Sequence, residues 1–217
     1  MPKLFKYVLA FFAMNKGRIL LLSLASFLML GLVSIIFDRE INLFIYAIRS
    51  PFLDSLFNFL SLAQIPGTIG GLLILIIAIL FFTKKEKIAW IIEMLLTFVL
   101  TYGITFLIKE LTDRARPYIV LGLQKPLIDA LGSSFPSTHA AILFSMLPFF
   151  EEEYPRAKYL WIAFAIIVCF VRIYLQVHYV SDIIFGAIIG YSIGFLLTKT
   201  DKRIIDKLIH KRNKKER

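Results

Sequence analysis

The chain has 217 residues, of which 59% are hydrophobic, with a mean hydropathy of +0.77 and a formal net charge of +10. This hydrophobic share is more than a water-soluble domain of this size can bury, so the composition excludes an ordinary soluble protein. The positive charge does not indicate nucleic-acid binding, because residues 1–18 and the tail from Lys199 hold the whole excess and no nucleic-acid-binding motif accompanies it.

Six apolar blocks follow one another along the chain, and a helix needs about 20 such residues to cross a membrane. They cover residues 19–37, 65–82, 88–108, 138–150, 157–171 and 179–197. We therefore predict an all-α, polytopic membrane protein with six transmembrane helices in one domain. In this domain, residues 1–18 are a basic, amphipathic segment, 19–197 are the six-helix core and 198–217 are a basic tail. We do not expect the first block to be a cleaved signal, because it is long and no small-residue cleavage site follows it.

The distribution of Lys and Arg predicts the orientation of the chain. Both basic termini and the short connection at residues 83–87, which holds three lysines, are placed on the cytoplasmic side. The connection at residues 38–64 mixes charged and apolar residues without a spanning run, so we predict amphipathic helix lying in the membrane interface there. This orientation predicts a multi-pass membrane protein with both termini in the cytoplasm.

The last apolar block carries a glycine at every fourth position, at Gly186, Gly190 and Gly194. Small residues at this spacing form a stripe on a helix that allows a neighbouring helix to approach closely. His178 and Asp182 continue the same spacing toward the start of the block. The upper end of the stripe is therefore predicted to face the bundle.

Three polar clusters interrupt the apolar pattern: KELTDRARP at 109–117, SSFPSTHA at 133–140 and RIYLQVHYVSD at 172–182. The first follows the third predicted helix, the second opens the fourth, and the third joins the fifth to the sixth. With six spans, all three clusters fall on the outer side of the membrane. At the centre of a bilayer such a charge costs about 2.5 to 3.5 kcal/mol, so charges set between apolar runs indicate function.

The residue types in these clusters favour phosphate chemistry. Arginine offers a planar fork for phosphate oxygens, and a serine at a helix start adds free backbone N–H groups. His178 and Asp182 lie one helical turn apart, so the carboxylate can orient the imidazole and leave its other nitrogen as a nucleophile. His139 is a second, separate proton donor. The predicted phosphate clamp contains Lys109, Arg116, Ser137 and Arg172.

The spacing of these residues resembles the three-part signature of the type 2 phosphatidic acid phosphatase (PAP2) superfamily. The matching patterns are Lys109 through Arg116-Pro117, then Pro136-Ser137-x-His139, then Arg172, His178 and Asp182 in the order and spacing of that family. The resemblance implies a phosphatase without metal or other cofactor that works through a phosphohistidine.

The resemblance also implies roles for single residues. His178 would be the nucleophile, Asp182 its partner and His139 the acid that protonates the leaving oxygen. The phosphate oxygens would be held by the remaining motif residues and nearby backbone N–H groups: Lys109, Arg116, Ser137, Thr138 and Arg172. The implied partners are membrane lipids and a lipid phosphate: phosphatidylglycerophosphate, undecaprenyl diphosphate, phosphatidic acid or the 1-phosphate of lipid A.

Two positions depart from the family pattern. Thr138 stands where the family usually has Gly, and Val171 stands where it usually has Ser. We expect the threonine to narrow the oxyanion side of the site and the valine to remove a hydroxyl that holds the phosphate or the nucleophile. Neither change removes a charged residue.

Several alternatives remain open at this point. A transporter or channel would also carry charges inside its membrane segments, but it would place them along the depth of the bundle. Two histidines and a carboxylate also suggest a metal site, which three nearby cations would repel. His178 and Asp182 could be a purely structural buried pair, and Arg114 a surface charge or a lipid-headgroup contact. The particular lipid, transfer of phosphate to another lipid and the oligomeric state do not follow from the sequence.

Overall fold

The computed structural model describes residues 16–62, 88–124, 126 and 132–215. Most of the predicted basic segment and the whole second apolar block, residues 65–82, lie outside these residues. The described part is helical, with no strand in it. Its helices are α2 (Lys16–Ala47), α3 (Pro51–Leu62), α5 (Ile88–Thr112), α6 (Pro117–Val120), α7 (Thr138–Ser145), α8 (Leu147–Glu153), α9 (Ala157–Tyr174) and α10 (Val180–Lys215).

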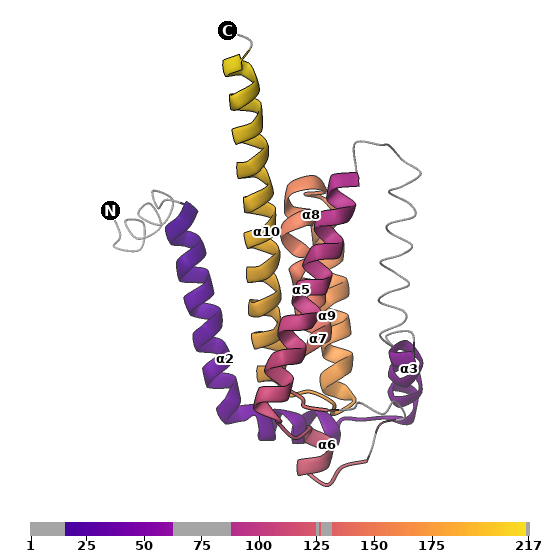
Figure 1. The fold of residues 1–217 in the computed structure, drawn as a ribbon. Helices are drawn as coiled ribbons and strands as arrows, with labels where there is room; N and C mark the ends of the chain where they lie inside the picture. Colours follow the sequence, from indigo (N-terminus) through magenta and orange to yellow (C-terminus); the bar gives the residue numbers. More distant parts are fainter. Residues whose placement is uncertain (1–15, 63–87, 125, 127–131, 216–217) are drawn as a thin grey trace, which may run out of the picture.

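The long helices run alongside one another as a bundle, and α3 and α6 lie near its lower end (Figure 1). The first described turn of α2 and the last turns of α10 lie at the opposite end. Helix α10 packs against α2, α5, α7 and α8, and its contact with α7 is the most extensive one between described helices. The all-α prediction is therefore confirmed for the described part of the chain.

The outer faces of the bundle are strongly apolar. Ile36 on α2, Leu107 on α5 and Leu160 on α9 are 72%, 59% and 77% exposed. Apolar surface of this extent is costly in water and favourable against lipid. Among the described residues, the segments Glu93–Val120, Ala157–Tyr174 and Val180–Lys199 are long and apolar enough to cross a membrane. Several apolar helices thus support a multi-pass membrane protein, whereas the count of six spans stays a prediction.

The fourth predicted helix differs from its expectation. Residues 138–150 were expected to form one helix, but the structure has α7 and α8, with a break at Met146. Pro148 lies in the first turn of α8, and a proline ring cannot donate the backbone hydrogen bond that a continuous helix needs there. The proline therefore divides the expected helix.

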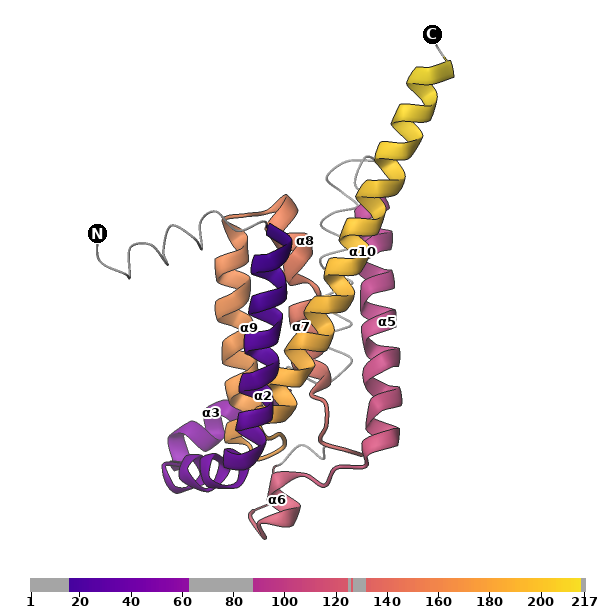
Figure 2. The ribbon, with the colours of Figure 1, turned by 90° about the vertical axis from the view of Figure 1, so that its left-hand side faces the viewer.

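The region after the first apolar block is more ordered than the sequence indicated. Helix α2 continues through residue 47 and bends, so that its last turns cross the lower end of the bundle (Figures 1 and 2). Helix α3 follows after a short turn that ends with Ser50, whose hydroxyl accepts from Leu53 N at 3.3 Å. Helical structure is thus present where amphipathic helix was predicted, and its depth in a membrane stays a prediction.

The turn between α2 and α3 is fixed to the end of α9. Arg49 Nε donates to Asp54 Oδ1 at 2.9 Å, and the Tyr174 hydroxyl donates to the same oxygen at 2.8 Å. Burial alone would raise the pKa of Asp54, but the hydrogen bonds from Arg49 and Tyr174 lower it. These contacts hold α3 beside the segment that carries Arg172.

The glycine stripe of α10 lies directly against α7, as predicted. A Cβ added at Gly186 would lie 2.6 Å from the carbonyl oxygen of Ser137. A Cβ at Gly190 or Gly194 would overlap the backbone of Ala141 or Ser145. No side chain fits between the two helices at these points, so the stripe fixes α7, with Ser137 at its start, against the helix of Asp182.

Candidate active site

The structure brings the three polar clusters together at the lower end of the bundle (Figure 1). Ser137 N donates to the carbonyl oxygen of Asp182 at 3.0 Å, which joins the second cluster to the third. Arg116 Nη1 donates to the carbonyl oxygen of Val177 at 2.8 Å, which joins the first cluster to the third. Segments up to about 70 residues apart in the sequence thus enclose one site.

His178 and Asp182 form the centre of this site. Both are buried, and Nδ1 of His178 lies 3.5 Å from Oδ2 of Asp182. That distance is longer than a good hydrogen bond, and Nδ1 makes none in the structure. Such contacts are often long without substrate, so the pair has the arrangement that an orienting carboxylate needs.

The surroundings of His178 disfavour its protonated form. Burial lowers the pKa of His178 well below its ordinary value, and the positive charges of Lys109, Arg116 and Arg172 lower it further. His139 acts in the same direction, so it also lies close by. At neutral pH the His178 imidazole is therefore neutral and keeps a free lone pair.

Two of the three predicted clamp cations hold backbone carbonyl groups around this pair. Lys109 Nζ donates to the Ser133 oxygen at 2.6 Å, and Arg116 Nε donates to the Gly132 oxygen at 3.1 Å. The backbone of Arg116 is in the extended conformation, because Pro117 follows it and begins α6. These contacts are to neutral carbonyl oxygens, and an anion is a stronger acceptor for a cation, so an anion would be favoured here.

Arg172 carries the clearest sign of an absent partner. It is buried, and Nη1 donates to Ser61 Oγ on α3 at 3.1 Å. Its Nε is also buried and has no hydrogen-bond partner among the described residues. A buried, unpaired donor is costly, and a phosphate oxygen would satisfy it.

The second cluster forms the start of α7. Ser137 is its N-cap residue, and its hydroxyl accepts from Ala140 N at 3.4 Å, which confirms the predicted helix start. Thr138 and His139 follow in the first turn and are partly buried. The first N–H groups of a helix lack partners within it, so this turn faces the site with hydrogen-bond donors.

Val171 packs in the apolar interior next to the site. It is fully buried in a cluster with Ile45, Tyr174, Leu175 and Val177. The expected effect of the missing hydroxyl on the phosphate or the nucleophile stays a prediction.

Sequence reasoning missed an ion-pair network behind the site. Arg114 is part of this network and is not an isolated surface charge, because Nη1 lies 2.6 Å from Asp182 Oδ1 and Nη2 lies 2.8 Å from Asp38 Oδ2. A headgroup contact of Arg114 stays a prediction. The RxR spacing of Arg114 and Arg116 was the only signal in the sequence, since Asp38 comes from the distant helix α2.

Asn42, one turn after Asp38, was also missed. Its Nδ2 donates to Gln176 Oε1 at 3.1 Å and to the His178 carbonyl oxygen at 3.3 Å. Gln176 has a φ of 59°, an uncommon conformation for a side-chain-bearing residue, and is completely buried. The bent end of α2 thus holds the turn that presents His178.

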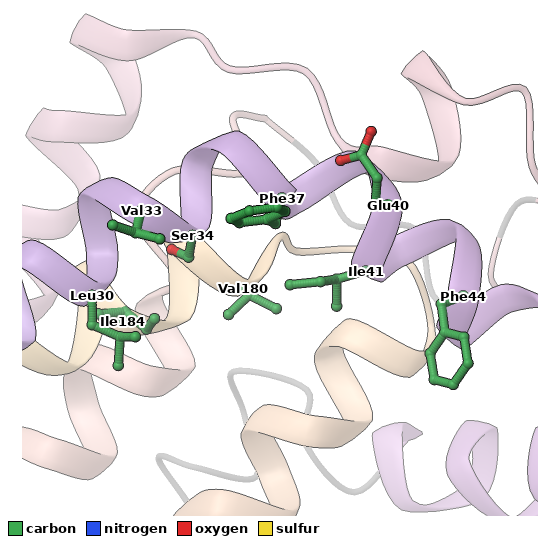
Figure 3. A pocket seen from close by; sticks show the side chains of 9 residues that line it. All are labelled: Leu30, Val33, Ser34, Phe37, Glu40, Ile41, Phe44, Val180 and Ile184. Atoms are coloured by element: carbon green, nitrogen blue, oxygen red, sulfur yellow. The ribbon is translucent and has the colours of Figure 1, made fainter.

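An apolar groove lies beside the site, between α2 and the start of α10 (Figure 3). Its volume is about 530 Å³. The lining residues are Leu30, Val33, Ser34, Phe37, Glu40, Ile41, Phe44, Val180 and Ile184. Val180 and Ile184 each lie two positions from Asp182 on α10, so they point to another side of this helix than the carboxylate does. The groove therefore lies at the same end of α10 as the polar site, but on a different face of the helix.

No group of three or more His, Cys, Asp or Glu side chains that could hold a metal ion occurs in the described residues. Cys169 is buried in the apolar interior, where it packs against neighbours.

Comparison with known proteins agrees with the site. A sequence model of the PAP2 superfamily matches residues 90–206. Phosphatidylglycerophosphatase B of Bacillus subtilis is 27% identical over 178 residues, which cover 77% of this chain and 84% of that protein.

Two crystal structures share the fold. A transmembrane PAP2-type phosphatidylglycerolphosphate phosphatase from Bacillus subtilis superposes with a TM-score of 0.66 at 23% identity, covering 83% of this chain and 96% of that one. Aquifex aeolicus LpxE superposes with a TM-score of 0.62 at 27% identity, covering 75% and 94%.

Proposed function

The chain belongs to the PAP2 superfamily, and from this we propose that it is a membrane phosphatase that removes phosphate from a lipid through a phosphohistidine. The observation that carries the proposal is the buried, neutral His178 surrounded by Lys109, Arg116 and Arg172. A neutral imidazole is a nucleophile, and three cations can neutralise the charge of a phosphoryl group in transfer.

In the proposed reaction, Nε2 of His178 attacks phosphorus as the bond from phosphorus to the lipid oxygen breaks. Asp182 accepts the Nδ1 proton as a hydrogen bond and stabilises the imidazolium that forms. His139 donates a proton to the departing lipid oxygen. Water then attacks the phosphohistidine, His139 takes up one of its protons, and phosphate leaves with His178 restored.

The remaining predicted residues hold the phosphate. Lys109, Arg116 and Arg172 supply positive charge, and the unpaired Nε of Arg172 supplies a donor that no described residue uses. Ser137 supplies its hydroxyl, which accepts from Ala140 N and still has its own proton to donate, and Thr138 supplies the first N–H group of α7. Phosphoryl transfer mainly requires such positioning and charge neutralisation.

The lipid's hydrocarbon chain is proposed to occupy the groove between α2 and α10. The groove is apolar, and Val180 and Ile184 place it at the end of α10 that carries Asp182 (Figure 3). A lipid whose chain lies in the groove would have its headgroup at the end of the bundle where His178 lies. We further propose that the site opens to the outer side of a bacterial inner membrane, with both termini in the cytoplasm and six spans in total.

A transporter or channel is the rival function. Its charges would follow the depth of the bundle. Among the described residues, the buried charged side chains Asp38, Arg116, Arg172 and Asp182 gather at one end with His178, and Glu93 on α5 is an exception. This distribution supports a surface-opening enzyme site.

The test is phosphate release by the purified protein in detergent with excess chelator. The panel contains phosphatidylglycerophosphate, phosphatidic acid, undecaprenyl diphosphate and lipid A, and the similarity to phosphatidylglycerophosphatase B puts the first of these at the head. His178→Ala should lower release more than about a thousandfold. Full activity in His178→Ala would reject the mechanism, and activity that depends on added metal would favour a metal site.

A further inference from the structure

Arg114 connects two carboxylates that belong to different helices. Nη1 donates to Asp182 Oδ1 at 2.6 Å and to Ser181 Oγ at 2.7 Å, both in the first turn of α10. Nη2 donates to Asp38 Oδ2 on α2 at 2.8 Å. The guanidinium also lies over the ring of Tyr179, with 4.1 Å from Cζ to the ring centroid. Its plane is therefore fixed on three sides.

Asp38 in turn holds the start of α10. The backbone N–H of Ser181 donates to Asp38 Oδ1 at 3.0 Å, and the Ser181 hydroxyl donates to Asp38 Oδ2. The first N–H groups of a helix need external acceptors, and a carboxylate at that end is favoured by the helix dipole. Asp38 thus acts as a cap supplied by another helix, which fixes α10 relative to α2.

The two residues together determine where the Asp182 carboxylate points. Oδ1 is held by Arg114, and Oδ2 accepts from Tyr179 N at 2.8 Å while facing Nδ1 of His178. A carboxylate held at both oxygens cannot rotate toward the cations Lys109, Arg116 and Arg172. Without Arg114, those cations would compete for Asp182.

We propose that Arg114 and Asp38 are positioning residues that hold Asp182 toward His178 during phosphoryl transfer. This inference rests on the proposed function. Arg114 does not bind phosphate in it, although it lies two positions from Arg116. Its contacts are with Asp38, Ser181 and Asp182, and two carboxylates neutralise it.

The experiment is a set of variants compared by kcat and KM on the lipid that the wild-type protein hydrolyses. Arg114→Gln and Asp38→Asn should each lower kcat about 10- to 100-fold, the range known for groups that orient a catalytic ligand, with KM changed less than about threefold. Arg114→Lys should recover part of the loss because it keeps the charge without the fork. The matched control is Arg49→Gln, which removes a different Arg–Asp pair at Asp54.

A double-mutant cycle separates positioning from general stabilisation. If Arg114 acts through Asp182, Arg114→Gln should have no further effect on kcat in an Asp182→Asn background. If Arg114→Gln lowers kcat in the Asp182→Asn background by the same factor as in the wild type, the proposal is overturned. It is also overturned if Arg49→Gln lowers kcat as much as Arg114→Gln does. If Arg114→Gln does not yield folded protein, as judged by its melting temperature, the cycle is run with Arg114→Lys.

The two proposals can fail separately. If no lipid in the panel is hydrolysed by the folded wild-type protein, the proposed function fails. If the wild type is active and His178→Ala is not, but Arg114→Gln and Asp38→Asn have wild-type kcat, only the positioning role is rejected.

Discussion

At the scale of single residues, the state of His178 decides whether the site can act. A histidine attacks phosphorus only as a neutral imidazole, and an ordinary imidazole is half protonated near pH 6.5. Burial and the positive charges of Lys109, Arg116 and Arg172 lower the pKa of His178. In the proposed mechanism, the cations that bind phosphate thus also keep the nucleophile unprotonated.

The first prediction follows from the sign of this shift. A base whose pKa is lowered stays neutral at more acidic pH, so His178 should remain neutral at pH 6 and take up a proton only well below 6.5. The measurement is a titration of nitrogen-15-labelled histidines by NMR in detergent. The chain has three histidines, and His178→Gln identifies the signal. A His178 signal that titrates at or above pH 6.5 would contradict the prediction.

Single residues also show where sequence reasoning stopped. The eight predicted site residues lie within the three PAP2 sequence motifs, so the spacing of these motifs was enough to select them. Asp38 and Arg114 lie 76 positions apart, and Asp38 and Ser181 lie 143 apart. No local pattern links such residues, because their contact depends on how α2 bends across the bundle.

At the scale of elements, the stripe of α10 shows how helix packing supports the site. Gly186, Gly190 and Gly194 let α7 lie against α10, and Ser137 and His139 belong to the first turn of α7. The distance between the second and third polar clusters therefore depends on the size of these side chains.

We predict that Gly190→Ala will impair both folding and activity. Its Cβ would overlap the carbonyl group of Ala141, so α7 must shift, at a cost of about 1 to 3 kcal/mol. A shift of the first turn of α7 should lower kcat at least about tenfold, because a misplacement of about 1 Å can cost a hundredfold. Thermal unfolding in detergent and phosphate release measure the two effects.

Gly103→Ala on α5 is the matched control. An added Cβ there meets nothing within 4 Å, and alanine is the better helix former, so stability should be unchanged or slightly higher. Equal behaviour of the two variants would show that the close approach of α7 and α10 does not matter.

The groove between α2 and α10 gives a second prediction at this scale. Val33 lines it and is 44% exposed, so Val33→Trp should fill part of the space. We expect a KM for the lipid substrate raised about tenfold or more, because each excluded CH₂ of a chain is worth about 0.8 kcal/mol. Hydrolysis of a water-soluble aryl phosphate should be unaffected, since that substrate has no hydrocarbon chain to place in the groove.

Ile36→Trp controls for a bulky side chain on the same helix, because Ile36 is 72% exposed and does not line the groove. If Val33→Trp and Ile36→Trp have the same KM for the lipid, the hydrocarbon chain of the lipid does not occupy the groove.

The elements were predicted unevenly, for physical reasons. Helices α5, α9 and α10 begin within one residue of the predicted apolar blocks, because an uninterrupted apolar run leaves few alternatives to a helix. The expected end of the first block at residue 37 was too early. Helix α2 continues because Asp38 and Asn42 are buried against α10 and the His178 turn, where their polar groups have protein partners and need no water.

At the scale of the whole molecule, the polar site and the described ends of the chain lie far apart. The polar site lies at one end of the bundle, and the start of α2 and the end of α10 lie at the other (Figure 1). Basic flanks favour the cytoplasmic side, and nine bases follow residue 198. Charge and architecture together therefore favour a site on the outer side.

The last prediction tests this orientation with cysteine labelling on intact cells. The one native cysteine, Cys169, is buried and should not react with a membrane-impermeant maleimide. Glu110 is exposed in the last turn of α5, and Arg156 is exposed between α8 and α9. The last turn of α5 lies at the site end of the bundle, and α8 meets α9 at the other end (Figure 1). Glu110→Cys should be labelled on intact cells, whereas Arg156→Cys should be labelled only after the membrane is permeabilised. The reverse pattern would place the phosphatase site in the cytoplasm, and its lipid phosphate would then have to come from the inner leaflet.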